Sequence, residues 1–101
     1  MANILYFFMK DYSVIKTPRS VLKSTAIKVR DLRRQRKYSQ SELAGRSGVS
    51  LGSLKRFETT GLISLESFLK LLHILDRLEE FDAILQPGEN LTAVEKLFTL
   101  K

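Results

Sequence analysis

Residues 39–58 run S-Q-S-E-L-A-G-R-S-G-V-S-L-G-S-L-K-R-F-E, and this stretch decides the fold. Ser39 is followed three residues later by Glu42, which is the spacing of a capping box at the start of a helix. Gly48 is suited to end that helix, because glycine adopts positive φ angles at little cost. Ser50 then predicts the N-cap of a second short helix. The stretch therefore predicts two helices joined by a tight turn.

The second of these helices, from residue 51 to residue 58 or 59, has two unlike sides. Leu54 and Phe57 stand three residues apart, which predicts that they face inward, whereas Lys55 and Arg56 face outward. A small basic helix held against a core is of a size that the major groove of DNA admits. The pattern therefore favours DNA as a ligand.

The composition limits the class of protein. A chain of 101 residues, 44% of them hydrophobic, suits one domain with one core. It has no cysteine, so disulfides and thiolate metal sites are excluded and a reducing cytosol fits. The apolar run at residues 4–9 is too short to span a bilayer and lacks the cleavage site of a secretory signal. We expect a cytoplasmic protein with no membrane partner.

Positive charge is concentrated in the first half of the chain. Residues 1–56 carry 13 Lys and Arg against 3 Asp and Glu, a balance of +10, whereas residues 57–101 carry 4 against 8, a balance of −4. Nine of the basic residues lie within residues 16–37, where Asp31 is the one acid. A solvated basic face would give the same pattern. Together with the basic helix, the asymmetry favours a polyanionic partner.

A longer helix is predicted before the two short ones. Thr17 and Pro18 fit an N-cap and a first helical position, and the helix continues to about Arg36. One apolar stripe follows it at three- and four-residue steps, made of Leu22, Ala26, Val29 and Leu32/Arg33. This stripe predicts which side of the helix meets the core.

Two helices are predicted after the short ones. Ser64 caps a helix from residue 65 to about residue 76, whose apolar residues cover more than one face, so something beyond the four-helix core must cover it. A fifth helix runs from about residue 79 to residue 85, before Pro87. The predicted fold class is therefore all-α with five helices. The domain spans residues 18–86, between an N-terminal extension (1–17) and a C-terminal tail (87–101).

The two end segments allow alternatives. The aromatic run at residues 3–9 favours a strand, which either pairs with its copy in a second subunit or is poorly ordered. The tail carries Leu91, Val94, Leu97 and Phe98 at helical spacing. It is too short to be a stable helix alone, so it either docks on the body or meets a partner.

Residues 28 to about 85 resemble the Xre, or Cro/C1-type, helix-turn-helix family. The matching segments are V-R-D-L-R-R-Q-R at 29–36, S-Q-S-E-L-A at 39–44, S-G-V-S at 47–50, L-K-R-F-E at 54–58 and S-L-E-S-F-L-K-L-L at 64–72. The resemblance implies a lambda-repressor-like DNA-binding domain of five helices that acts as a dimer on inverted-repeat operators. Residues 50–58 and the short tail are most similar to HipB-like antitoxins, which neutralise a HipA-like kinase toxin and repress their own operon.

The resemblance assigns base contacts to Leu51, Gly52 and Arg56. Leucine can only pack against a thymine methyl group, and glycine offers its backbone and close approach. We therefore expect Arg56 to carry most of the base contact, to guanine O6 and N7, with Lys55 sharing it. An ordinary surface leucine at position 51 and an internal salt bridge of Arg56 are the alternatives. The shape of the DNA would supply the remaining specificity.

The resemblance assigns phosphate contacts to Gln40, Ser53 and Lys55, with Gln40 at the start of its helix. Arg30 and Arg34 could reach flanking phosphates, although a merely solvated role fits them equally well.

Glu58 resembles the buried acid of the family, and its implied partner is Arg33 near the end of the first helix. Such an ion pair would tie that helix to the DNA-contacting helix. The alternative is two exposed charges.

No feature of the sequence predicts an enzyme. His73 is the only histidine and lies within an apolar helix, so it is expected to be packed or half-exposed. The acidic cluster of Glu79, Glu80 and Asp82 lies at a helix start, where the helix dipole favours it. We expect no catalytic residue, no metal and no cofactor.

The leading hypothesis is a dimeric, sequence-specific transcriptional repressor of the bacterial nucleoid that binds double-stranded DNA. We expect it to be the autoregulatory antitoxin of a HipA-like kinase toxin. One alternative is a phage- or plasmid-type repressor without a toxin partner. The other is a protein-interaction module that has lost DNA binding, which Leu51 and Gly52 make conceivable.

Overall fold

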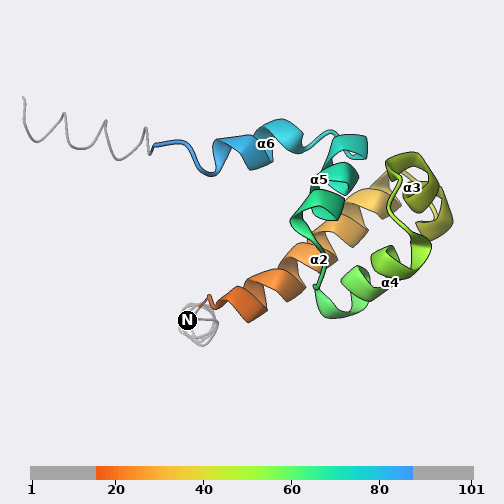
Figure 1. The fold of residues 1–101 in the computed structure, drawn as a ribbon, viewed down its shortest axis with the longest axis horizontal. Coiled ribbons are helices and arrows are strands. Elements are labelled where there is room, and N and C mark those ends of the chain that lie inside the picture. The colour runs from red at the N-terminus through yellow and green to blue at the C-terminus, as the bar shows by residue number, and fades with distance from the viewer. Residues whose placement is uncertain (1–15, 88–101) are drawn as a thin grey trace, which may run out of the picture.

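The computed structural model describes residues 16–87, which form five α-helices (Figure 1). They are α2 (Pro18–Gln35), α3 (Gln40–Ser47), α4 (Leu51–Thr60), α5 (Leu65–Ile74) and α6 (Leu78–Ala83). The all-α prediction is confirmed, and the helices end within about two residues of the predicted boundaries. The predictions of a strand at residues 3–9 and of an amphipathic tail lie outside the described residues.

Hydroxyl side chains cap four of these helices. The side-chain oxygens of Thr17, Ser39, Ser50 and Ser64 each accept a hydrogen bond, 3.0–3.1 Å long, from the backbone N–H three residues on. Thr17 and Ser39 belong to capping boxes, so the backbone N–H of each cap is also satisfied. Each cap stabilises its helix by about 1 kcal/mol. The starts of α2, α3, α4 and α5 are thus set by local sequence.

Glycines end the two short helices. Gly48, after α3, has φ +80°, and Gly61, after α4, has φ +83°. Their backbone N–H groups donate to the carbonyl oxygens of Ala44 and Phe57, at 2.9 and 2.7 Å. These left-handed caps turn the chain sharply, so that α3 packs against α4 and α5 while α4 packs against α2.

One core lies between α2, α3, α4 and α5. Its buried side chains are Ala26, Val29, Leu43, Ala44, Val49, Leu54, Phe57, Leu71, Leu72 and Leu75. Phe68 stacks edge-to-face on Phe57, with ring centroids 6.0 Å apart, and on Phe81 of α6 at 5.8 Å. The last helix is therefore joined to the core through an aromatic chain.

Two apolar side chains that were predicted to be covered, Leu65 and Leu22, remain exposed. Phe68, Leu69 and Ile74 of α5 are half-buried and Phe81 of α6 packs on Phe68, whereas Leu65 at the start of α5 remains 60% exposed. Leu22, which the apolar stripe placed in the core, is 40% exposed. The N-terminal turns of α2 extend past the neighbouring helices, so the stripe is longer than the core it meets (Figure 1).

We expect Gly61→Ala to destabilise the protein more than Gly48→Ala. An added Cβ at Gly61 would lie 2.8 Å from the backbone carbonyl atoms of Leu22, whereas nothing lies within 4 Å of the same atom at Gly48. The positive φ alone costs about 1–2 kcal/mol, and the overlap at Gly61 adds about 1–3 kcal/mol. Chemical denaturation of both variants measures the difference. An equal loss of unfolding free energy in the two variants would contradict the close approach of α2 to the end of α4.

Candidate nucleic-acid interface

Helix α4 is divided into a buried side and an exposed side. Leu54 and Phe57 are 0% and 1% exposed, whereas Gly52, Lys55 and Arg56 are all exposed. A helix turns about 100° per residue, so these two sets lie on opposite sides of one short rod. Nothing lies within 4 Å of the Cβ position of Gly52, which leaves an open notch in the exposed side.

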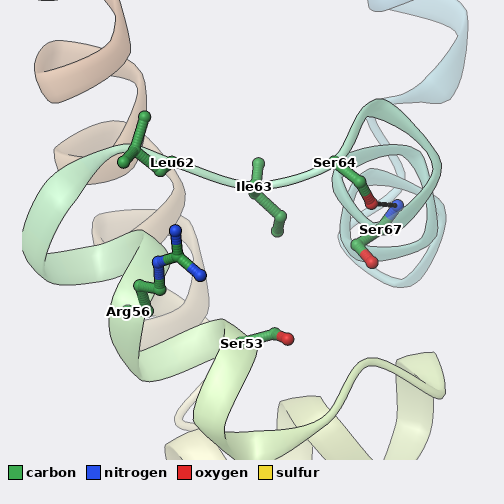
Figure 2. Close-up of a pocket in the computed structure, with 6 residues that line it drawn as sticks. All are labelled: Ser53, Arg56, Leu62, Ile63, Ser64 and Ser67. Carbon is green, nitrogen blue, oxygen red and sulfur yellow. Dashed lines mark hydrogen bonds between the residues drawn. The ribbon is translucent and has the colours of Figure 1, made fainter.

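Arg56 faces a hollow between α4 and the start of α5. Figure 2 shows Arg56 and Ser53 extending from α4 towards the side where Ser64 and Ser67 begin α5. Leu62 and Ile63, in the connecting loop, complete the lining. Within residues 16–87 the guanidinium of Arg56 has no carboxylate within ion-pair distance and donates no hydrogen bond. Its charge is therefore available to a ligand.

Leu51 and Ser53 have additional local contacts. The side chain of Leu51 is half-buried and packs against the core, so only its outer edge can meet a ligand. The Ser53 hydroxyl accepts a hydrogen bond of 2.8 Å from the Ser50 hydroxyl and remains exposed. Leu51 is thus a surface leucine only in part, because the rest of its side chain packs against the core.

A buried ion pair fixes the orientation of α4. Arg33 Nε and Nη2 donate to Glu58 Oε2 and Oε1 at 2.8 and 3.0 Å, and Arg33 Nη1 donates to the Tyr38 carbonyl oxygen at 2.9 Å. The two side chains are only 9% and 6% exposed. The paired, parallel hydrogen bonds set both distance and angle between α2 and α4.

Gln40 joins this ion pair. Its Nε2 donates to Glu58 Oε1 at 2.9 Å, so the start of α3 is tied to the same carboxylate. The family resemblance implies only a phosphate contact for Gln40, so this bond to Glu58 was not predicted. The partners lie 18 residues apart in the chain, so no local spacing marks the contact.

A second hollow lies on the other side of α4. It is lined by Arg30, Arg33, Arg34, Ser39, Gln40, Glu58 and Thr59. Arg34 is exposed, and the Nε of Arg30 is buried without a hydrogen-bond partner among the described residues. Asp31 is the nearest acid to that nitrogen, at 4.0 Å. The exposed side of α4 is therefore flanked by two hollows, each with an arginine and a helix start.

The family comparison fits this arrangement. A family model described as Helix-turn-helix, of the Xre (Cro/C1) type, matches residues 29–81, which is just over half of the chain. The chain belongs to this helix-turn-helix family. No curated protein and no solved structure shows significant similarity to it.

Members of this family are DNA-binding domains and are generally non-enzymatic. The helix-turn-helix protein described here is accordingly a DNA-binding transcription regulator. The matched residues include α3, α4 and both hollows, so the family assignment covers the whole candidate interface.

Residues 16–87 hold neither a membrane-spanning helix nor a cluster of metal-ligating side chains. In the described part of the chain, no helix has the length and apolar character needed to cross a bilayer. No three His, Asp or Glu side chains there gather into a group that could hold a metal ion. His73 is exposed beside an apolar groove, and Glu80 accepts a hydrogen bond from Arg77 at 2.8 Å.

We expect Glu58→Ala to destabilise the helix-turn-helix domain by about 3–5 kcal/mol, because it would leave the buried Arg33 guanidinium without its counter-charge. Lys70→Ala is the matched control, since it breaks the exposed Lys70–Glu66 pair at 3.8 Å. The control should lose less than about 1 kcal/mol. Urea denaturation compares the two. Similar small losses would show that the buried pair does not anchor α4.

Proposed function

We propose that this regulator is a sequence-specific transcriptional repressor that binds, as a dimer, an inverted-repeat operator. The observation that carries the proposal is the exposed side of α4, where Arg56 has no carboxylate partner among residues 16–87 and a hollow lies on each side of the helix. The major groove is about 12 Å wide and is bordered by a phosphate backbone on each side. With α4 in the major groove, one phosphate backbone of the DNA would lie near each of the two hollows.

Base recognition falls mainly to Arg56 in this proposal. Its guanidinium is exposed, and its planar donors match guanine O6 and N7. Lys55, the preceding residue, is a second exposed donor. The open notch at Gly52 would let a base edge or the sugar-phosphate chain approach the backbone, and the exposed edge of Leu51 would meet a thymine methyl group.

Phosphate contacts would flank the groove. Arg30, Arg34 and the start of α3 at Gln40 line one hollow, and Ser53 lines the other. The Gln40 amide can bond a phosphate through its second N–H while the first stays on Glu58. Each phosphate neutralised by a lysine or arginine releases counterions, so affinity should fall steeply with salt.

The proposed dimer would use the apolar side of α5 and α6. Leu65 at the start of α5, Leu78 at the start of α6, and Ile84 and Leu85 just after α6 are exposed apolar side chains. A groove beside them is lined by Leu69, Ile74 and Leu78 together with polar side chains. This groove shares no lining residue with the hollow that Arg56 faces, so two subunits could pair through it without covering Arg56.

The antitoxin role is a narrower proposal that rests on the resemblance of residues 50–58 to HipB-like proteins. Co-purification with a kinase-like protein would support it. A phage- or plasmid-type repressor would have the same DNA-contacting side and would co-purify with no such partner.

The test uses DNA duplexes selected from a random pool by the wild-type protein. Arg56→Ala should lose about 1–3 kcal/mol of binding free energy on the selected duplex and little on unselected DNA, because a bidentate base contact is sequence-specific. Lys28→Ala, an exposed control on α2, should leave both affinities nearly unchanged. Binding is measured by fluorescence anisotropy at several salt concentrations.

Equal loss on both duplexes would refute base recognition by Arg56. A wild-type protein that binds no duplex at low salt would refute the repressor function and favour the protein-interaction module.

A further inference from the structure

We propose that α2 makes a second contact with DNA, through a row of basic side chains along one edge of the helix. This α2 basic row consists of Arg19, Lys23, Arg30 and Arg34. Its N-terminal half would bind phosphates beyond the base pairs covered by α4. The inference rests on the proposed DNA-binding function and extends it to the length of DNA that one subunit covers.

The spacing of the four residues aligns them. They are separated by four, seven and four positions, and a helix turns about 100° per residue, so all four fall within roughly 60° of arc. From Arg19 to Arg34 the rise is about 22 Å, which equals roughly six base-pair steps of 3.4 Å. Lys28 falls on the other side of the helix axis, more than about 100° from each of them.

The C-terminal half of the row lies on the same side of the molecule as the candidate interface. Arg30 and Arg34 line the hollow next to α4, together with Thr59. Lys23 continues that edge to the level of Leu22, whose backbone meets Gly61 at the end of α4, and Arg19 lies about one turn beyond it. The row therefore begins beside α4 and runs beyond its last residue.

The core does not explain the N-terminal turns of α2. The first buried residue of the helix is Ala26, so the turns before it are not embedded in the core. They are held by the Thr17 capping box, by Pro18 at the first helical position and by the close approach of the Leu22 backbone to Gly61. A helix that extends past its core in this way presents its side chains to solvent or to a ligand.

The charges at this helix start also oppose the helix dipole. The first turn of α2 holds no acidic residue and contains Arg19, although the dipole favours negative charge there. Arg19 and Lys23 are exposed and have no carboxylate partner within residues 16–87. Because these two positive charges do not stabilise α2, their placement fits a polyanionic ligand that binds this end of the helix.

The test compares two lengths of the duplex selected by the wild-type protein. One ends flush with the selected site, and the other carries about eight further base pairs on each side, enough to span the roughly 22 Å of the row. The wild-type protein should bind the long duplex more tightly and with a steeper salt dependence. The double variant R19Q/K23Q should lose this preference. Its slope of log K against log salt should fall by about 1.8, and its affinity for the long duplex by at least tenfold, in roughly 0.1 M salt.

The control variant K28Q removes one positive charge from α2 at a position outside the row. It should keep the preference for the long duplex, and neither variant should melt below the wild type, since glutamine is as good a helix former as lysine and arginine. An equal loss per charge removed in the two variants, or no loss in R19Q/K23Q, would overturn the α2 basic row while leaving base recognition by Arg56 intact. Failure of the wild-type protein to bind either duplex would overturn the proposed function and the row with it.

Discussion

The buried pair of Arg33 and Glu58 is the interaction on which the rest of the structure depends. Glu58 lies on α4, Arg33 lies on α2, and Gln40 at the start of α3 donates to the same carboxylate. A third donor of Arg33 holds the Tyr38 carbonyl oxygen in the turn between α2 and α3. One carboxylate thus fixes the mutual orientation of three helices, with geometry that apolar contacts alone would not define.

This orientation decides what α4 presents to the outside. With Glu58 drawn towards α2, and with Leu54 and Phe57 in the core, the exposed positions of the helix are Gly52, Ser53, Lys55, Arg56, Thr59 and Thr60. Those positions carry the basic side chains and the notch at Gly52. The hydroxyl caps and left-handed glycines then place the starts of α3 and α5 beside α4. Stability and the DNA-contacting side therefore arise from the same few residues.

Local chemistry explains why so much of the fold was predictable from the sequence. The hydroxyl caps, the turn at Gly48 and the inward spacing of Leu54 and Phe57 each involve residues a few positions apart. The domain limits at residues 18 and 86, and the specific contacts of each site residue with DNA, remain predictions.

What the sequence did not predict depends on distant residues. The bond from Gln40 to Glu58 and the hollow that Arg56 shares with Ser64 and Ser67 both need the tertiary arrangement. The partial burial of Leu51 and the exposure of Leu22 depend on how far each helix extends past its neighbours. The spacing of apolar residues in the sequence does not reveal that extent.

The most direct test of this account is an NMR titration of the labelled protein with the selected duplex. The account predicts that the largest amide shift changes fall on Gly52, Lys55, Arg56 and Thr59 and on the start of α3, with smaller changes along α2. Changes confined to α5 and α6, with α4 unaffected, would contradict the claim that the exposed side of α4 meets DNA.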